Sequence, residues 1–185
     1  MAKHIWNICQ FNTCSHWTDW IKIYLICKRS FWDLHIPNAC SWTWRKILKL
    51  RDLFRPLIKS IIGDGADTWL WFDNWTPLGP IHLSFGDRVI YDYTLSRDAR
   101  VATIIQGSWR WPVANSPDLL TLKGAIPHSI IPNSTLRDKL SWTPSPSGTF
   151  STKSSWTAIR STRPLVLWHN IVWYPHAIPR TSFIL

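Results

Sequence analysis

SIIGDGADTWLWFDNW, which spans residues 60–75, sets a glycine turn between two runs of β-prone residues. Gly63-Asp64-Gly65 is a turn signal, because glycine adopts the backbone conformations that tight turns require. The runs on either side, 60–62 and 68–72, predict the two arms of a β-hairpin. Side chains alternate along a strand, so this hairpin would place Trp69 and Trp71 on one face.

Two helical patterns precede this stretch. Apolar residues recur at helical spacing between residues 15 and 27, which predicts a first helix with one apolar face. That face consists of Trp17, Trp20, Ile21, Tyr24 and Leu25. A longer helix is predicted from Trp42, with Ser41 as its N-cap. Pro56 predicts a break near Arg55, because proline lacks an amide hydrogen and clashes with the preceding turn.

The longer helix has an apolar arc and a basic arc on opposite sides. The apolar arc consists of Ile47, Leu50, Leu53, Phe54, Leu57, Ile58 and Ile61. The basic arc predicts a nucleic-acid-binding surface, because lysine and arginine neutralise phosphates and release condensed counterions. Its candidate residues are Arg45, Lys46, Lys49, Arg51, Arg55 and Lys59. The alternative interpretation is a solvated helix face without a partner.

Two expectations about individual side chains follow from the basic arc. Replacing Arg51 and Arg55 by alanine would weaken binding to RNA or DNA. A Trp exposed among these bases would stack on nucleobases. Most of the fifteen Trp residues are expected in the core, because burying a Trp removes a large apolar area from water.

The chain beyond residue 80 is predicted to form short, mixed elements as far as residue 132. Stronger signals follow, with a strand over 139–143, a turn over 144–148 and a returning strand over 149–151. Ser151 is the predicted cap of a helix that runs to Arg160 and turns Ser155, Trp156 and Ile159 inward. Another helix is predicted around 165–173. These elements predict an α+β fold of mixed helices and short antiparallel hairpins, with incomplete folding left open.

The composition differs from that of an average globular domain. The chain has 15 Trp among 185 residues, and all of its 11 acidic residues are Asp. Hydrophobic residues make up 45%, enough to build the core of one ordinary domain or two small ones. A net charge of +10 would attract polyanions such as RNA or DNA. Without a long apolar run or a secretory signal, a soluble intracellular protein in the nucleus or cytoplasm is expected, with no membrane partner.

Residues that carry catalytic or metal chemistry are sparse. A loose, zinc-like spacing links Cys9, Cys14, Cys27 and His35, but its second pair is too widely spaced, and free thiols are expected. Asp64 and Asp67 flank a Gly-Ala turn, where ordinary turn chemistry is expected rather than a metal. The seven histidines lie apart from any nucleophile with an orienting acid. The sequence therefore predicts no catalytic residue, metal, cofactor or small-molecule substrate.

Motifs framed by Trp follow one another along nearly the whole chain. They occupy residues 2–8, 41–51, 62–65, 71–75, 140–142, 148–151, 155–156, 168–173 and 178–180. In this order they resemble the C-terminal part of plant non-LTR retrotransposon polyproteins, of the long interspersed type. The motifs from Leu140 onward resemble the entry into the zinc-binding region that follows the reverse transcriptase in that family.

This resemblance implies three segments. They are a helical segment after the polymerase palm (1–62), a hairpin and irregular linker (63–138), and the start of the zinc-binding region, cut before its Cys and His ligands (139–185). The family's polymerase chemistry needs an adjacent pair of palm aspartates to hold two metal ions. This chain has no adjacent acidic pair.

The expected function is therefore that of a polyprotein fragment without catalysis of its own, which at most still binds RNA or DNA. Two alternatives stay open. One is a basic nucleic-acid-binding module that the host has retained. The other is a product that is untranslated or unfolded.

Overall fold

The computed structural model describes residues 1–12, 15–93, 95–105, 109–110, 116–126 and 135–160 of the chain. Within these ranges α-helices combine with a two-stranded antiparallel sheet, which confirms the α+β class. The α-helices are α1 (Ala2–Cys9), α2 (His16–Trp20), α3 (Trp42–Phe54), α4 (Ile81–Phe85), α5 (Arg88–Asp92), α6 (Pro117–Ala125) and α7 (Thr152–Ile159). The strands are β1 (Ile58–Ile61) and β2 (Lys139–Trp142). Shorter helical turns are η1 (Ile21–Ile26), η2 (Phe31–Asp33), η3 (Arg55–Leu57) and η4 (Val101–Ile104).

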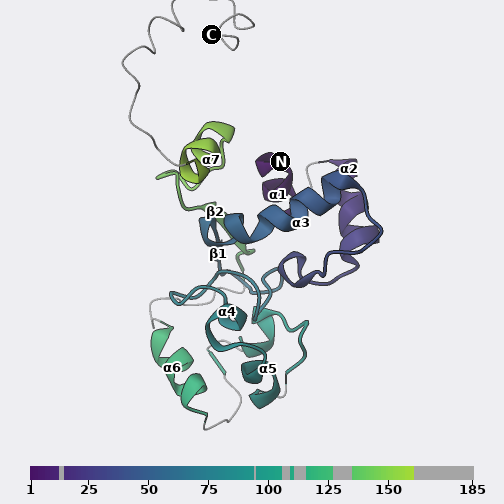
Figure 1. The fold of residues 1–185 in the computed structure, drawn as a ribbon. Helices are drawn as coiled ribbons and strands as arrows, with labels where there is room; N and C mark the ends of the chain where they lie inside the picture. Colours follow the sequence, from purple (N-terminus) through teal and green to yellow (C-terminus); the bar gives the residue numbers. More distant parts are fainter. Residues whose placement is uncertain (13–14, 94, 106–108, 111–115, 127–134, 161–185) are drawn as a thin grey trace, which may run out of the picture.

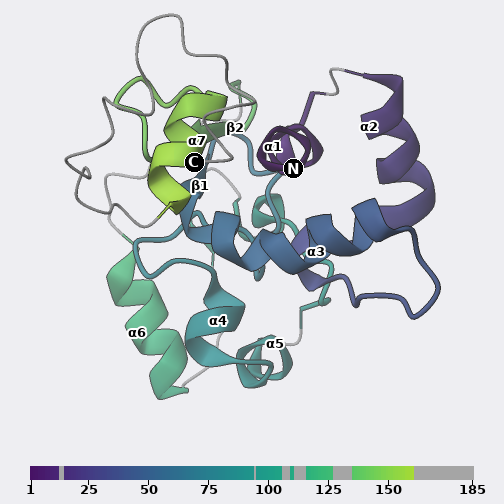
Figure 2. The same ribbon diagram turned by 45° about the horizontal axis from the view of Figure 1, so that its top comes forward.

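The sheet lies between two groups of helices. Helices α1, α2, α3 and α7 lie on one side of β1 and β2, and α4, α5 and α6 lie on the other (Figures 1 and 2). Helix α1 contacts both α3 and α7. Strand β1 belongs to the predicted segment 1–62, and β2 belongs to the predicted segment 139–185. Because β1 pairs with β2, the described residues of these two segments pack together. No helix in the described ranges is both long enough and apolar enough to span a bilayer.

The first predicted helix is present as α2 followed by the π-helical turn η1. Ser15 caps it, because its Oγ accepts a hydrogen bond from the amide of Thr18 at 3.3 Å. The predicted apolar face is confirmed for Ile21, which is buried, and for Leu25, which is half-buried against the core. It is wrong for Trp17, Trp20 and Tyr24, whose side chains are 39%, 50% and 64% exposed. In a π-helix the backbone bonds join residues five apart, so Ile26 faces the core together with Ile21, in place of Tyr24.

The longer helix begins and ends as predicted. Ser41 accepts a hydrogen bond from the amide of Trp44 at 3.3 Å, and α3 ends at Phe54, directly before the turn that contains Pro56. Most of the predicted apolar arc is buried or half-buried. Leu53 and Ile61 are exceptions, at 47% and 53% exposed. Ile61 points outward because β1 alternates its side chains, whereas a helix would not.

The predicted hairpin over residues 60–72 is wrong. Strand β1 pairs with β2 instead, in an antiparallel register that sets Ile58 opposite Trp142 and Ile61 opposite Lys139. Trp69 forms an isolated bridge with Arg100. A strand over 139–142 is confirmed, but its partner is β1, at residues 58–61, rather than 149–151.

A buried carboxylate explains why the glycine turn does not close a hairpin. Asp138 accepts hydrogen bonds from the amides of Gly63, Gly65, Asp67 and Thr68 at 2.7, 2.9, 3.2 and 3.0 Å, and from the Thr68 hydroxyl at 2.7 Å. The loop therefore curls around the residue that precedes β2. Gly63 is required there, since a Cβ would lie 2.3 Å from the Leu136 carbonyl oxygen, and Gly65 has a φ of +74°.

The last described helix is capped as predicted. Ser151 accepts a hydrogen bond from the amide of Ser154 at 3.0 Å, and Ser155 is buried. Trp156 was predicted to point inward, but its side chain is 66% exposed. The helix predicted around 165–173 lies outside the described residues.

Aromatic rings form the centre of the part of the core that joins α1, α3 and β2. The ring of Trp142 lies 5.1 Å from Phe150, 6.0 Å from Trp6 and 6.2 Å from Phe54, measured between centroids. Trp71 and Trp75 are also fully buried. Most of the described Trp residues are thus buried or half-buried, as expected, and four are exposed: Trp17, Trp20, Trp42 and Trp156.

Candidate functional site

The basic residues predicted on the longer helix do not share one surface. Arg51 and Arg55 face the protein, whereas Lys46 and Lys49 are exposed on α3 and Lys59 is exposed on β1. Arg51 follows Lys46 by five residues, which is about 140° around an α-helix at 3.6 residues per turn. The predicted basic arc therefore divides into an inner and an outer set.

The inner arginines bind backbone carbonyls. Arg55 is 4% exposed, and its Nε and Nη2 donate to the carbonyl oxygen of Phe72 at 3.2 and 2.6 Å. Burial lowers the pKa of its guanidinium, which lies 5.6 Å from the centroid of the Trp32 ring. Arg55 therefore does not lie at the surface where the sequence places it, and it cannot reach a phosphate in this conformation.

Arg51 is half-buried and ties the segment before α3 to the helix. Its Nη1 donates to the carbonyl oxygens of Phe31, at 3.2 Å, and Leu34. Burial also lowers the pKa of this guanidinium. Replacing Arg51 and Arg55 would thus leave three carbonyl oxygens without these donors, so it is a test of stability rather than of nucleic-acid binding.

The outer set forms a stripe along α3, which consists of Trp42, Arg45, Lys46 and Lys49. The Trp42 side chain is 67% exposed, and the Lys46 ammonium lies 5.8 Å from the centroid of its ring. Arg45 Nη2 donates to the Asn38 carbonyl oxygen at 2.6 Å, which fixes its guanidinium beside the helix. Residues 42, 45, 46 and 49 recur at helical spacing, so this α3 stripe presents an aromatic ring and two exposed cations, Lys46 and Lys49, to solvent beside the half-buried Arg45.

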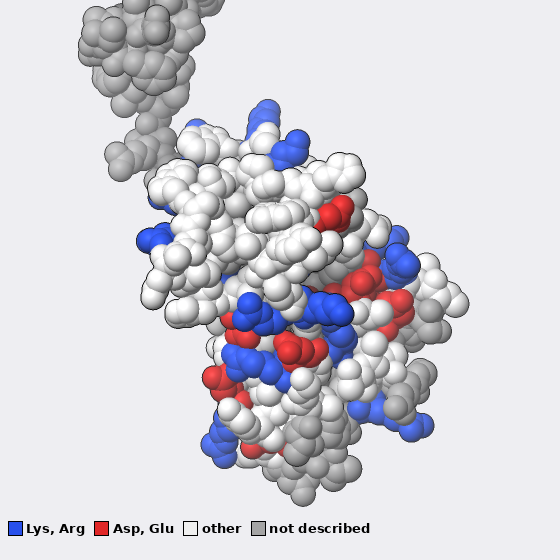
Figure 3. Space-filling model, turned by 90° about the vertical axis from the view of Figure 1, so that its right-hand side faces the viewer, with Lys and Arg blue, Asp and Glu red and all other residues white. Residues whose placement is uncertain are grey.

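Charge elsewhere on the surface is mixed. Figure 3 shows basic and acidic side chains interspersed across the middle of one face, below an upper part that is largely uncharged. Arg97 is one paired cation: it donates to both Asp33 oxygens, at 2.8 and 2.7 Å, and to Asp87 at 2.7 Å. The net charge of +10 therefore does not by itself locate a binding surface.

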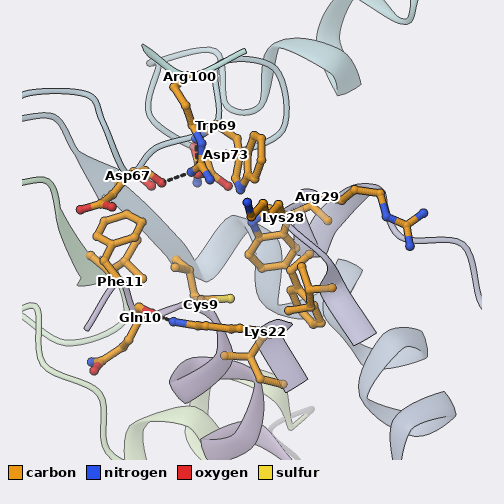
Figure 4. A pocket seen from close by; sticks show the side chains of 18 of the residues that line it. Cys9, Gln10, Phe11, Lys22, Lys28, Arg29, Asp67, Trp69, Asp73 and Arg100 are labelled. Carbon is orange, nitrogen blue, oxygen red and sulfur yellow. Dashed lines mark hydrogen bonds between the residues drawn. The ribbon is translucent and has the colours of Figure 1, made fainter. Parts of the chain in front are cut away.

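A cavity of about 420 Å³ lies between α1, η1, η2 and the strands. Its wall combines apolar and aromatic side chains with four cations, Lys22, Lys28, Arg29 and Arg100, and two acids, Asp67 and Asp73. In Figure 4, Cys9, Gln10 and Lys22 lie on one side of the cavity, and Trp69, Asp73 and Arg100 lie on the other. The Lys22 ammonium donates to the Gln10 carbonyl oxygen.

Burial dominates the electrostatics of this cavity. Asp73 is 6% exposed, and desolvation raises the pKa of its carboxyl to about 7, although the Trp69 amide donates to it at 2.7 Å and Arg100 lies nearby. Desolvation also lowers the pKa of the Arg100 guanidinium and raises that of the Cys9 thiol. Asp73 and Arg100 are thus poorly solvated, which strengthens their electrostatic interactions, whereas Lys28 and Arg29 are exposed.

No metal centre forms among the described residues. They contain no group of three His, Cys or Asp side chains that could hold an ion, and Cys14 lies outside them. Cys27 is exposed, and Cys9 and Cys40 are half-buried free thiols. Asp64 accepts a bond from the Ala66 amide at 3.0 Å, which is the turn chemistry expected of it.

Sequence reasoning missed both the cavity and the Asp138 loop. Glycine pairs such as Gly63 and Gly65 signal amides that need an acceptor, but the acceptor lies 75 residues from Gly63 and carries no local signal. Cavity residues likewise come from segments that are distant in the sequence. Comparison of the chain with protein-family models, curated proteins and solved structures finds no match.

Proposed function

We propose that the chain is a noncatalytic nucleic-acid-binding module, and that the α3 stripe is its contact surface for a single strand. Single-strand binding combines cations that follow the phosphates with exposed rings on which bases stack. The exposure of the Trp42 ring is the main observation that supports the proposal. The ring is 67% exposed on a helix face that it shares with Arg45, Lys46 and Lys49.

The resemblance to plant non-LTR retrotransposon polyproteins supports the same proposal from the sequence, since such proteins act on RNA and DNA. We propose that the chain derives from such a polyprotein, as a fragment without catalysis of its own. A module retained by the host would bind through the same surface. The alternative of an unfolded product makes a different prediction, because only a folded core gives a cooperative thermal transition by circular dichroism.

The binding test compares two equally exposed Trp residues. Trp42 and Trp156 are 67% and 66% exposed, on α3 and α7. Trp42→Ala is expected to weaken binding to fluorescein-labelled single-stranded RNA by about 5- to 150-fold, because stacking of one base on an aromatic ring contributes about 1–3 kcal/mol. Trp156→Ala serves as the matched control and is expected to leave the affinity unchanged. Fluorescence anisotropy at low salt measures both.

Strand preference provides a second readout. Bases in a duplex are already stacked on each other, so the wild-type protein is expected to bind single strands more tightly than duplexes of the same length. Equal losses in Trp42→Ala and Trp156→Ala would remove α3 as the site. Absence of binding to any nucleic acid at low salt, by a protein that melts cooperatively, would refute the proposed function.

A further inference from the structure

The cavity between α1, η1, η2 and the strands is large enough for a small organic ligand. Its volume of about 420 Å³ falls within the roughly 300–1,000 Å³ that ligand pockets occupy, and far exceeds the space that one water molecule needs. It shares no residue with the α3 stripe. Any ligand of this cavity would therefore occupy a place separate from the proposed nucleic-acid surface.

The wall offers flat apolar surfaces. Four of its residues are aromatic: Phe11, Phe31, Trp32 and Trp69. Arg100 adds a further flat group, since its guanidinium carbon lies 3.4 Å from the centroid of the Trp69 ring. A planar ligand ring gains both apolar contact and stacking against such walls.

Cations outnumber acids around the cavity, and one of them has donors to spare. Arg100 is half-buried, and its Nη1 donates to the Asp67 carbonyl oxygen at 2.5 Å. A guanidinium carries five N–H donors, and within the described part of the chain the Arg100 side chain makes no other hydrogen bond and no salt bridge. An acidic ligand group could use the remaining donors in the paired geometry that arginine forms with carboxylates and phosphates.

Poor solvation strengthens the case for an anion. Desolvation opposes the charged form of both Arg100 and Asp73, so neither charge is fully compensated by water. A bound anion would offset the desolvation of the Arg100 guanidinium, whereas a bound cation would meet Lys22, Lys28 and Arg29 as well as Arg100.

We propose that this cavity binds a planar organic anion. The acidic group of the ligand is held by the cations of the wall, and its ring lies against the aromatic side chains. Two sources share this chemistry: a nucleoside monophosphate and an aromatic carboxylic acid.

Isothermal titration calorimetry of the full chain with four probes tests the proposal. Adenosine monophosphate and naphthoate each carry a ring and an anionic group, adenosine carries a ring without the charge, and inorganic phosphate carries the charge without a ring. At least one planar anion is expected to bind about tenfold or more tightly than adenosine and phosphate, since one charge-assisted contact in a poorly solvated site is worth this factor. The tighter of the two anions identifies the source.

Two variants locate the site. Arg100→Gln is expected to weaken binding of the preferred anion about tenfold, and Lys28→Gln about threefold because its exposed ammonium is better solvated. Lys153→Gln, at an exposed position on α7, is the control with the same change in charge. If Arg100→Gln does not melt cooperatively, the Lys28→Gln variant alone tests the site, because replacing an exposed side chain leaves the protein folded.

Three results would overturn the inference. The first is that neither planar anion binds at millimolar concentration. The second is that adenosine binds as tightly as adenosine monophosphate, while naphthoate binds no more tightly than adenosine. The third is that Lys28→Gln and Lys153→Gln change the affinity of the anion equally.

Discussion

The inner and outer sides of α3 and of the turn η3 that follows it both carry basic residues, in opposite environments. On the inner side, Arg51 and Arg55 donate to backbone carbonyls and are half-buried or buried. On the outer side, Lys46 and Lys49 are exposed next to Trp42. Counting the basic residues on a helix therefore overestimates the positive charge that is accessible to a binding partner. Cations that satisfy carbonyls stabilise the fold, and only the outer cations remain for phosphates.

The largest expected effect on stability comes from an acidic residue, and it can be compared in the same way between a buried and an exposed side chain. Asp138→Ala should lower the free energy of unfolding by about 5 kcal/mol, because four amides and a hydroxyl lose a buried acceptor and each unsatisfied donor costs about 1–3 kcal/mol. Asp64→Ala, which removes an acceptor from one amide, should cost less than about 1 kcal/mol. Urea unfolding of both variants measures the difference. Similar losses would mean that Asp138 does not organise the loop.

The pH dependence of stability should reveal Asp73. Its pKa is about 7 in the folded protein and about 4 in an unfolded chain, so between these values the folded state holds a proton that the unfolded state has released. The free energy of unfolding should therefore fall by up to about 4 kcal/mol as the pH rises from 4 to 7, and then level off. Thermal melts across this range of wild type and Asp73→Asn measure the slope. The variant should lack this component, and identical slopes would contradict the assignment.

The inner and outer sides of α3 can be compared with one type of replacement. Arg55→Met should destabilise the fold by about 3 kcal/mol, since the Phe72 carbonyl oxygen loses both of its guanidinium donors inside the protein. Lys49→Met, at an exposed position, should change stability by less than about 0.5 kcal/mol. Denaturant midpoints of the two variants give the comparison. Equal effects would show that the two sides of α3 do not differ.

Local signals predicted much of the secondary structure. Ser41 and Ser151 cap helices where the sequence places them, and Pro56 ends α3 as expected, because each of these effects depends on neighbouring residues only. The hairpin prediction failed because Asp138, a residue distant in the sequence, binds the glycine turn. The apolar face of the first helix is only partly correct: Ile21 is buried, but Tyr24 is exposed because a π-helical turn over Ile21–Ile26 changes the period from which the face was inferred.

The candidate site could be predicted in part. Helical spacing alone separates Lys46 and Lys49 from Arg51 and Arg55, so the division of the basic arc was accessible from the sequence. Exposure of Trp42 was not, since Trp44, two positions later, is buried. The cavity required the fold, because Cys9, Lys22, Asp73 and Arg100 meet only after distant segments pack together.

The salt dependence of RNA binding tests most directly whether the outer side of α3 carries the function. Lys46→Gln combined with Lys49→Gln is compared with Lys153→Gln combined with Arg160→Gln, which removes the same charge from exposed positions at α7. The account predicts that the first pair lowers the slope of log K against log salt by about 1.4, since each lost phosphate contact to a single strand contributes about 0.7. The second pair should leave the slope unchanged. Equal changes in both pairs would contradict the account, because binding would then follow net charge rather than the α3 stripe.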